Sequence, residues 1–319
     1  MRFFHNLQTV AKLNLPVVAT IGNYDGVHLG HRSVLSSLFA TAHELNLPTL
    51  VILFEPQPEE YFPHKEAPAR LTTLSEKLLA LQEIGVDYVL CLRFDEFLAN
   101  YSAEKFIEKV LHKSLNIKYL VVGDDFVFGK NKQGSALTLE KYAKNMGWEV
   151  LEMPTYKMLG ARVSSSAIRL ALQNDDLELA TSMLGHCYSM RGRVIHGEKR
   201  GREIGFPTAN IHVRHKILPV SGVYVVRVVG IPDGKQYYGV VNIGFRPTFA
   251  ENTRRLVEVY ILDFEGDLYG HKLTIEFLHK LRKEQKFADF TLLQKQISKD
   301  ISQTKKIVSR LEKHNEKHI

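Results

Sequence analysis

The chain has 319 residues, of which 45% are hydrophobic, and its formal net charge is +7. This length suits two domains, and the basic charge suits a polyanionic partner such as nucleic acid, a membrane surface or phosphorylated small molecules. Cys91 and Cys187 form no CxxC pair, which disfavours a disulfide framework or a zinc knuckle. No segment reaches the roughly 18 apolar residues of a membrane helix, which disfavours a membrane protein. Because the first 15 residues also lack the apolar core of a leader peptide, we expect a soluble, cytoplasmic protein.

The first half of the sequence alternates between strand-like and helix-like segments. Short runs rich in Val, Ile and Leu predict buried strands at 16–22, 48–56, 86–94, 117–126 and 148–153. Helical spacing appears between them at 32–45, 71–85 and 102–115. This alternation is typical of a parallel sheet flanked by helices, so we predict an α/β domain over residues 1–184.

The second half has a different pattern. Strand-like segments lie at 191–197, 222–230, 236–244, 254–264 and 272–281, with turn signals such as 232–234 and 265–267 between them. Helical spacing returns only near the end, at 287–311, where Leu292, Ile297, Ile301 and Ile307 fall near one face. We therefore predict that residues 185–319 form a small antiparallel barrel or sandwich with a C-terminal helix.

The segment GNYDGVHLGH follows the first predicted strand and begins the first predicted helix. Glycines let a backbone turn sharply near a ligand, and a helix N-terminus favours phosphate, which imidazole N–H groups can also bind. The candidate ATP- and phosphate-binding residues here are Gly22, Asn23, Asp25, His28, Gly30 and His31. The alternative is that Asp25 caps the turn and the two histidines are incidental.

Other phosphate and metal motifs are excluded. The segment from Gly129 imitates a Walker loop, but Ser135 stands where that loop needs lysine. No GxGxxG follows a strand, and the HxGH pattern is not the HExxH of zinc enzymes.

A second polar segment, VSSSAIR, precedes the helix predicted at 167–173. Ser164, Ser165 and Ser166 are typical of a helix cap, and capping alone would explain them. Hydroxyls, free N–H groups and Arg169 at one helix start would also bind a triphosphate, which makes Ser165, Ser166 and Arg169 candidate ligands.

A third segment, GDDFVFG, ends the fourth predicted strand. Asp124, Phe126 and Phe128 could flank a flat ring, although the two phenylalanines could equally be core residues.

In the second half, GREIGFPTAN concentrates glycine, proline and small polar residues in one loop. A hydroxyl and an amide oxygen suit Mg²⁺ and phosphate. The candidates are Gly201, Gly205, Pro207, Thr208 and Asn210, and an ordinary loop is the alternative.

Two glutamates lie within apolar predicted strands. Glu258 and Glu276 each have apolar neighbours, where a carboxylate costs stability unless it is solvated, paired or functional. Either could act as a base toward an alcohol, and the pattern does not choose between them.

The first three motifs together resemble the HxGH nucleotidyltransferases, and GNYDGVHLGH with GDDFVFGKNKQG and VSSSAIR looks like the FAD synthetase half of bacterial bifunctional riboflavin kinase/FAD synthetases. The resemblance implies a Rossmann-like domain that transfers an adenylyl group from ATP to FMN and releases pyrophosphate. His28 and His31 would stabilise phosphate charge, Mg²⁺ would assist, and Asp124, Phe126 and Phe128 would bind the flavin. Tyr24 departs from the family's frequent phenylalanine, and Gln57 stands where many members have histidine, so we leave Gln57 outside the catalytic set.

The second half resembles riboflavin kinase in the order of its segments, from RGREIGFPTANI through VEVYILDF to LRKEQKF. The resemblance implies that ATP phosphorylates riboflavin to FMN, with Thr208 and Asn210 holding Mg²⁺ and phosphate. It puts the catalytic base on Glu258 and a flavin-binding arginine on Arg282.

Two rival functions stay open. One is an HxGH adenylyltransferase with another acceptor, such as pantetheine phosphate, which leaves GFPTAN and VEVYILDF unexplained. The other is a basic, nucleic-acid-binding barrel, which would need exposed aromatics among Lys and Arg, whereas the strand aromatics here lie among aliphatics. We therefore expect riboflavin, FMN and ATP as partners, and neither nucleic acid nor membrane.

Overall fold

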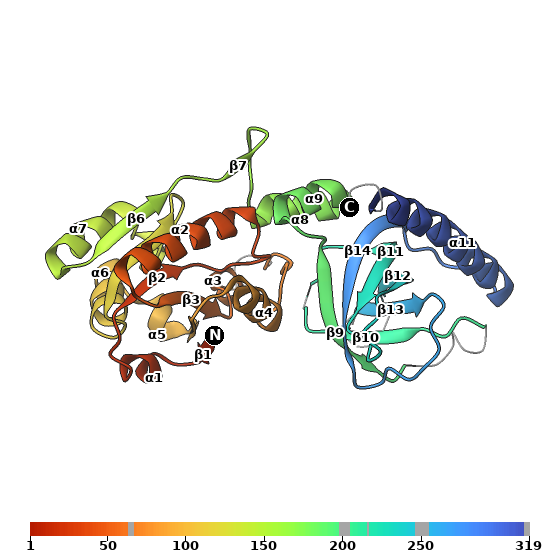
Figure 1. The fold of residues 1–319 in the computed structure, drawn as a ribbon, viewed down its shortest axis with the longest axis horizontal. Helices are drawn as coiled ribbons and strands as arrows, with labels where there is room; N and C mark the ends of the chain where they lie inside the picture. Colours follow the sequence, from red (N-terminus) through yellow and green to blue (C-terminus); the bar gives the residue numbers. More distant parts are fainter. Residues whose placement is uncertain (63–66, 198–204, 216, 246–254, 316–319) are drawn as a thin grey trace. The chain divides into compact units, whose positions relative to one another are not determined.

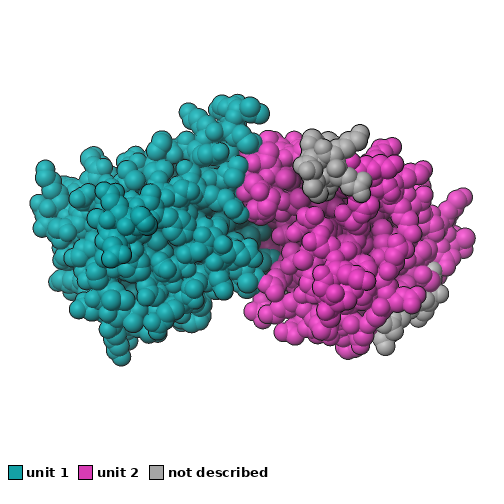
Figure 2. Space-filling model, viewed as in Figure 1, with its two compact units in different colours: residues 1–167 teal, residues 168–319 magenta. Residues whose placement is uncertain are grey.

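A computed structural model describes residues 1–62, 67–197, 205–215, 217–245 and 255–315. The chain divides into two compact units, Met1–Ala167 and Ile168–Ile319, which Figure 2 colours separately. Each unit contains its own main sheet, so each buries a core of its own.

The first unit is built on a six-stranded parallel sheet with the order β1-β4-β3-β2-β5-β6. The strands are β1 (Arg2–Phe4), β2 (Val17–Ile21), β3 (Thr49–Glu55), β4 (Tyr88–Arg93), β5 (Ile117–Gly123) and β6 (Glu149–Met153), which confirms the five predicted strands and adds β1 at an edge. The chain continues from β2 to β3 and β4 on one side, while β5 and β6 extend the sheet on the other. Parallel sheets bind ligands at the carboxyl ends of their strands beside such a reversal.

Helices connect these strands (Figure 1). They are α1 (Leu7–Ala11), α2 (Leu29–Leu45), α3 (Pro58–Tyr61), α4 (Leu74–Ile84), α5 (Glu96–Ala99), α6 (Ala103–Phe106) with a π-helical continuation (Ile107–His112), a 3₁₀ turn (Lys130–Lys132) and α7 (Ala136–Met146). A short hairpin, β7 (Lys157–Met158) and β8 (Ala161–Arg162), follows β6. The sequence specifies both ends of α4. Thr73 and Glu76 form a capping box at its start, and Gly85 ends it with a φ of 103°.

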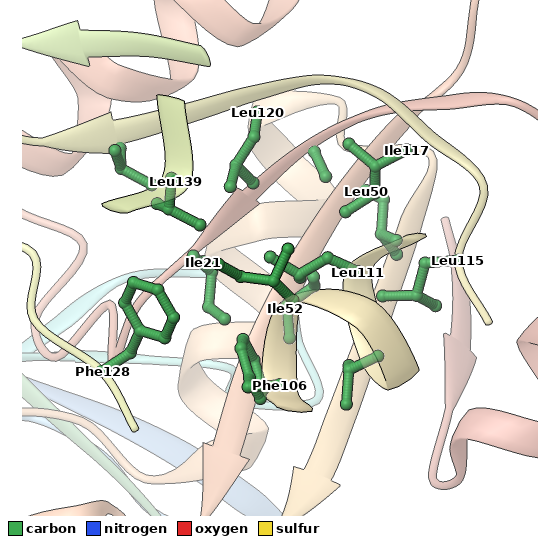
Figure 3. Close-up of a cluster of buried hydrophobic side chains, with 14 of the residues drawn as sticks. Ile21, Leu50, Ile52, Phe106, Leu111, Leu115, Ile117, Leu120, Phe128 and Leu139 are labelled. Carbon is green, nitrogen blue, oxygen red and sulfur yellow. The ribbon is translucent and has the colours of Figure 1, made fainter. Parts of the chain in front are cut away.

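Apolar side chains cover both faces of the sheet. On β2, Val17, Ala19 and Ile21 belong to one buried cluster and Val18 belongs to another, as the period of two in a strand requires. Figure 3 shows the first cluster, in which Ile21, Leu50 and Ile52 from the strands pack with Phe106 and Leu139 from the helical layer. The continuous apolar runs in the sequence are therefore strands buried on both faces.

The second unit contains a closed antiparallel barrel with the order β10-β13-β12-β11-β14-β9. Its strands are β9 (Ser189–Ile195), β10 (Ala209–Val213), β11 (Gly222–Val229), β12 (Tyr237–Phe245), β13 (Arg255–Ile261) and β14 (Lys272–Arg282). The prediction of a barrel or sandwich is confirmed as a closed barrel. The predicted loop at 201–210 is partly wrong, because Asn210 already lies in β10.

Two helices precede the barrel, α8 (Ser165–Gln173) and α9 (Leu177–Leu184), and the turn between them is tied to it. The Asp175 carboxylate forms an ion pair with Lys280 on β14 and accepts a hydrogen bond from the Tyr224 hydroxyl on β11 at 3.3 Å. Most of α8 and all of α9 therefore belong to the second compact unit. The division of the two activities at residues 184 and 185 stays a prediction.

A long C-terminal helix, α11 (Phe290–Asn315), contacts β12 of the barrel. Its most buried side chains are Asp300, Thr304 and Val308, spaced one turn apart. Ile297, Ile301 and Ile307 lie beside this stripe and are partly buried, as predicted. Leu292 does not, since it is 49% exposed near the helix start.

Candidate active sites

The turn after β2 has an unusual backbone. Tyr24, Gly26 and Val27 have φ angles of 48°, 86° and 42°, which place all three in the left-handed region. A β-branched residue such as Val27 strongly disfavours that region. Tyr24 is buried, its hydroxyl lies 2.7 Å from Thr20 Oγ1, and burial raises the pKa of its phenol above the usual range. A strained turn of this kind persists only where its surroundings fix it.

Asp25 is one residue that fixes this turn. Its buried carboxylate accepts hydrogen bonds from the Leu71 N–H at 3.1 Å and the Thr72 N–H at 2.9 Å. The next residue, Gly26, donates its N–H to Thr72 Oγ1 at 2.9 Å. The Asp25 side chain thus joins the turn to the segment before α4, which fits the alternative that it caps structure. Its predicted part in phosphate binding stays a prediction.

The two histidines lie together at the start of α2. His28 is the N-cap, and its Nδ1 accepts a hydrogen bond from the His31 N–H at 3.3 Å. The rings stack with centroids 3.7 Å apart at 19°. Because Nδ1 of His28 accepts, a neutral His28 carries its proton on Nε2. Burial, the neighbouring His28 and Lys77 hold the pKa of His31 well below its ordinary value, so His31 is neutral at physiological pH.

The serine motif meets this turn at the start of α8. Ser164 Oγ accepts from the Ala167 N–H at 3.2 Å and caps the helix, while Ser165 Oγ donates to the Asp25 carbonyl at 2.9 Å. The structure therefore brings together two motifs that are about 140 residues apart. Ser166 is exposed, and Arg169 is buried one turn further along the helix.

The GDDFVFG segment follows β5. The Asp124 carboxylate accepts from the Thr155 hydroxyl at 2.7 Å and from its N–H at 2.8 Å, and these bonds lower the pKa of Asp124. Phe126 and Phe128 stack with centroids 5.4 Å apart, but Phe128 belongs to the core cluster and is only 8% exposed. The structure thus gives both Asp124 and Phe128 a structural part, and their flavin contacts stay a prediction.

In the barrel, Gly205, Pro207 and Thr208 line a cavity of about 960 Å³. Tyr237 on β12 and Tyr269 before β14 also line it. Gly201, which we also predicted to bind phosphate, lies outside the described residues.

Next to this cavity, the strands place polar residues side by side. On β13, Glu258 pairs in register with Asn210 on β10 and with Asn242 on β12. Register partners on neighbouring strands have side chains on the same face of the sheet, with Cβ atoms roughly 5 Å apart. Val257 and Val259 are buried on the opposite face. Glu258 therefore belongs to a polar row, in which our sequence analysis missed Asn242.

The other glutamate has a different environment. Glu276 on β14 forms an ion pair with Arg227 on the neighbouring strand β11, with N–O contacts of 2.6 Å. Two strands, β11 and β12, separate β14 from β13 on that side of the barrel. The tertiary structure thus distinguishes two carboxylates that the sequence pattern could not.

Arg282, predicted to bind flavin, lies at the end of β14. Its guanidinium forms an ion pair with Asp300 on α11, with Nη2 2.8 Å and Nε 3.1 Å from the same carboxylate oxygen. Gln296 donates to the other Asp300 oxygen at 2.8 Å. These contacts attach the C-terminal helix to the barrel.

Comparison with known families assigns both units. The FAD synthetase family model matches residues 11–167, and the riboflavin kinase family model matches residues 184–308. A bifunctional riboflavin kinase/FMN adenylyltransferase from Escherichia coli K12 is 47% identical over 300 residues, which cover 94% of this chain and 95% of the relative. The chain belongs to the bifunctional riboflavin kinase/FMN adenylyltransferase family.

Two further comparisons agree over nearly the whole chain. The Haemophilus influenzae riboflavin kinase/FMN adenylyltransferase is 45% identical and covers 96% of this chain and 98% of its own length. A crystal structure described as a macrolide-efflux protein from Streptococcus pneumoniae has a TM-score of 0.80 at 28% identity and covers 95% of this chain. The two-unit fold is therefore that of the riboflavin kinase/FMN adenylyltransferase family.

The oxygen donors of the riboflavin kinase unit fit Mg²⁺. Thr208 lines the cavity, and the Asn210 amide occupies space beside Gly197 that a Cβ there would fill. Mg²⁺ prefers such oxygen ligands and needs few of them, because phosphates and water complete its shell. The described residues contain no cluster of three or more His, Cys, Asp or Glu side chains suited to a metal.

One buried residue beside the FMN adenylyltransferase turn, Lys77, was not among the predicted site residues. Lys77 on α4 is 1% exposed, and its Nζ donates to the Asn23 carbonyl at 2.8 Å. Gln57, which we left aside, is 2% exposed, and its Nε2 has no hydrogen-bond partner in the described part of the chain. The position of Lys77 within the apolar stripe of α4, one turn before the buried Leu81, was a signal in the sequence.

Proposed function

We propose that each unit carries one of two consecutive ATP-dependent reactions. The protein phosphorylates riboflavin to FMN and then transfers an adenylyl group from ATP to FMN, which gives FAD and pyrophosphate. Residues 1–184 are assigned to the adenylyl transfer and residues 185–319 to the kinase reaction. The observation that carries the first assignment is the pair of stacked imidazoles at the start of α2, beside the switch point of the sheet.

In the adenylyl transfer, an oxygen of the FMN phosphate attacks the α-phosphorus of ATP and pyrophosphate leaves. The main chain of Gly22–Asp25 and Gly30 approaches the phosphates, and His28 and the neutral His31 donate hydrogen bonds as negative charge shifts to the leaving group. Ser165, Ser166 and Arg169 at the start of α8 bind the departing pyrophosphate. The residues mainly position charges, and no covalent intermediate is needed.

The flavin of FMN is assigned to the segment after β5. Asp124, Phe126 and Phe128 supply one carboxylate and two stacked rings, and Phe126 is the less buried of the two rings. In the kinase unit Arg282 contributes to the flavin site, either directly or by fixing α11 through Asp300.

In the kinase reaction, the 5′-hydroxyl oxygen of riboflavin attacks the γ-phosphorus of ATP and ADP leaves. Glu258 accepts the hydroxyl proton, and Asn242 and Asn210 flank it in the same row. Gly205 and Pro207 shape the phosphate loop, and Gly201, which lies outside the described residues, stays a predicted phosphate ligand. Thr208 and Asn210 would hold Mg²⁺, which neutralises phosphate charge when it is bound.

The structure is compatible with a cytoplasmic enzyme. None of the described helices has both the length and the apolar character to cross a membrane. Both cysteines are free thiols, which suits a reducing compartment where ATP is available. We therefore assign the two reactions to the cytoplasm.

The test uses the full chain with riboflavin, ATP and Mg²⁺, with the flavins resolved by chromatography. We expect His28→Ala to lower FAD formation by roughly 10²–10³-fold, the usual loss for one donor to transition-state charge, and to keep FMN formation. Glu258→Gln keeps the shape of the side chain but accepts no proton, so FMN formation should fall by roughly 10²–10⁴-fold. FAD formation from supplied FMN should then be normal. If His28→Ala makes FAD at the wild-type rate, the histidines are structural and their proposed part in the transfer is wrong.

A further inference from the structure

Lys77 is almost completely buried without being part of either family motif discussed above. It lies in the first turn of α4 and is 1% exposed. Burial lowers the pKa of its amino group, partly offset by the nearby negative charge of Asp25. Taking an ammonium group out of water costs several kcal/mol in general. The hydrogen bond that its Nζ donates to the Asn23 carbonyl at 2.8 Å is therefore formed at a cost in folding free energy.

The carbonyl that Lys77 holds begins the strained turn. The next residue, Tyr24, and then Val27 have left-handed φ angles, each of which costs on the order of 1–3 kcal/mol. The turn ends directly at His28, the N-cap of α2. A change in the main chain at Asn23 would therefore be passed to the position of both histidine rings.

The segment around Lys77 holds the turn at three separate points. The Leu71 and Thr72 amides bind the Asp25 carboxylate, Thr72 Oγ1 binds the Gly26 N–H, and Lys77 binds the Asn23 carbonyl. From the other side, Ser165 donates to the Asp25 carbonyl. Because Thr20 also holds the Tyr24 hydroxyl, all four consecutive residues 23–26 have a partner outside the turn, which is what preorganised phosphate binding needs.

Lys77 also acts on the site through its charge. After burial and the neighbouring His28, it is a cause of the low pKa of His31. The positive charge of Lys77 thus contributes, after burial, to keeping His31 neutral, and it adds to the potential that attracts phosphate.

We propose that Lys77 is a positioning residue for adenylyl transfer: by holding the Asn23 carbonyl it fixes the turn that presents His28 and His31 to the phosphates. The inference rests on the proposed function of these histidines. It differs from a stabilising role alone, because the turn would stay folded through Tyr24, Asp25 and Gly26 but lose the alignment of the rings. A misplacement of about 1 Å lowers catalysis by as much as 10²-fold.

Lys77→Met tests the proposal, because methionine keeps an unbranched buried side chain and removes the donor and the charge. The full chain is assayed at saturating FMN and ATP, well below its unfolding temperature. We expect the kcat of FAD formation to fall roughly 10- to 100-fold, with the KM for ATP changed much less. Riboflavin phosphorylation by the same sample is the internal control and should be unchanged.

The matched control is Leu139→Ala. Leu139 is fully buried in the first unit, but in the cluster on the other face of the sheet. It should lower the unfolding temperature, since such a truncation costs about 2–5 kcal/mol, and leave the kcat of FAD formation within about 2-fold. If Lys77→Met lowers kcat no more than Leu139→Ala does, the proposal is wrong and Lys77 only stabilises the fold.

Two further variants keep the outcome decisive. If Lys77→Met does not fold, the same kinetic criterion applies to Lys77→Leu, which also removes the donor and the charge. His28→Ala separates the proposal from the function on which it rests. Loss of FAD formation in His28→Ala with normal kcat in the Lys77 variant overturns only the positioning role. Normal FAD formation in His28→Ala overturns the proposed role of the histidines, on which the inference rests.

Discussion

The ion pair between Arg282 and Asp300 gives a quantitative prediction about the barrel unit. The Asp300 side chain is 4% exposed, and three of the hydrogen bonds to its carboxylate come from Arg282. Arg282→Met removes all three and leaves Gln296 as a remaining neutral donor. Breaking a buried pair by removing one partner costs about 3–5 kcal/mol, because the other charge stays buried. For a unit of this size, each kcal/mol lowers Tm by about 2–4 °C, so the expected decrease is roughly 6 to 20 °C.

The assay follows unfolding by circular dichroism and by loss of riboflavin phosphorylation. A double variant, Arg282→Met with Asp300→Leu, removes both charges and should recover most of the lost stability, since an apolar pair replaces an ion pair at little cost. The two proposed roles of Arg282, anchoring α11 and binding the flavin directly, predict different results. An unchanged Tm together with a large increase in the riboflavin KM would refute the anchoring argument and show that Arg282 serves the flavin directly.

Two other predictions concern a glutamate and a cysteine. Glu276→Gln breaks a partly exposed ion pair with Arg227, so it should lower the free energy of unfolding by at most about 1 kcal/mol and leave FMN formation unchanged. An inactive Glu276→Gln beside an active Glu258→Gln would show that the base was assigned to the wrong strand. Burial raises the pKa of the Cys91 thiol to about 11. An alkylating reagent at pH 8 should therefore modify Cys91 only as the first unit unfolds. Modification at the rate of a free thiol would contradict the burial of this side chain. Because the folded state keeps this proton longer than the unfolded chain, the thiol's contribution to stability is complete below the unfolded pKa of about 8.5 and is lost as pH rises toward 11. Urea unfolding of Cys91→Ala should therefore show a smaller alkaline decrease than that of the wild type.

Much of the fold could be predicted from the sequence, because burial leaves a local pattern. Strands buried on both faces appear as continuous apolar runs such as 17–21, and the antiparallel half shows its turns directly. Even so, β1 at the sheet edge and β10 after the polar loop were missed. Both strands are short, and their hydrogen bonds to distant partners, rather than their composition, define them.

The sequence by itself determined the family and the chemistry, since residue types at fixed spacing, such as HxGH before a helix, state which groups are available. Only the tertiary structure decided what those groups contact. It gave the Asp25 carboxylate to Leu71 and Thr72, joined Ser165 to the histidine turn, and separated Glu258 from the ion-paired Glu276. These are contacts between residues 46 to 140 positions apart, or between strands whose register the pattern does not fix. Lys77 is the clearest case: its place in the apolar stripe of α4 indicates burial, but only the fold shows that its amino group contacts the turn that carries the histidines.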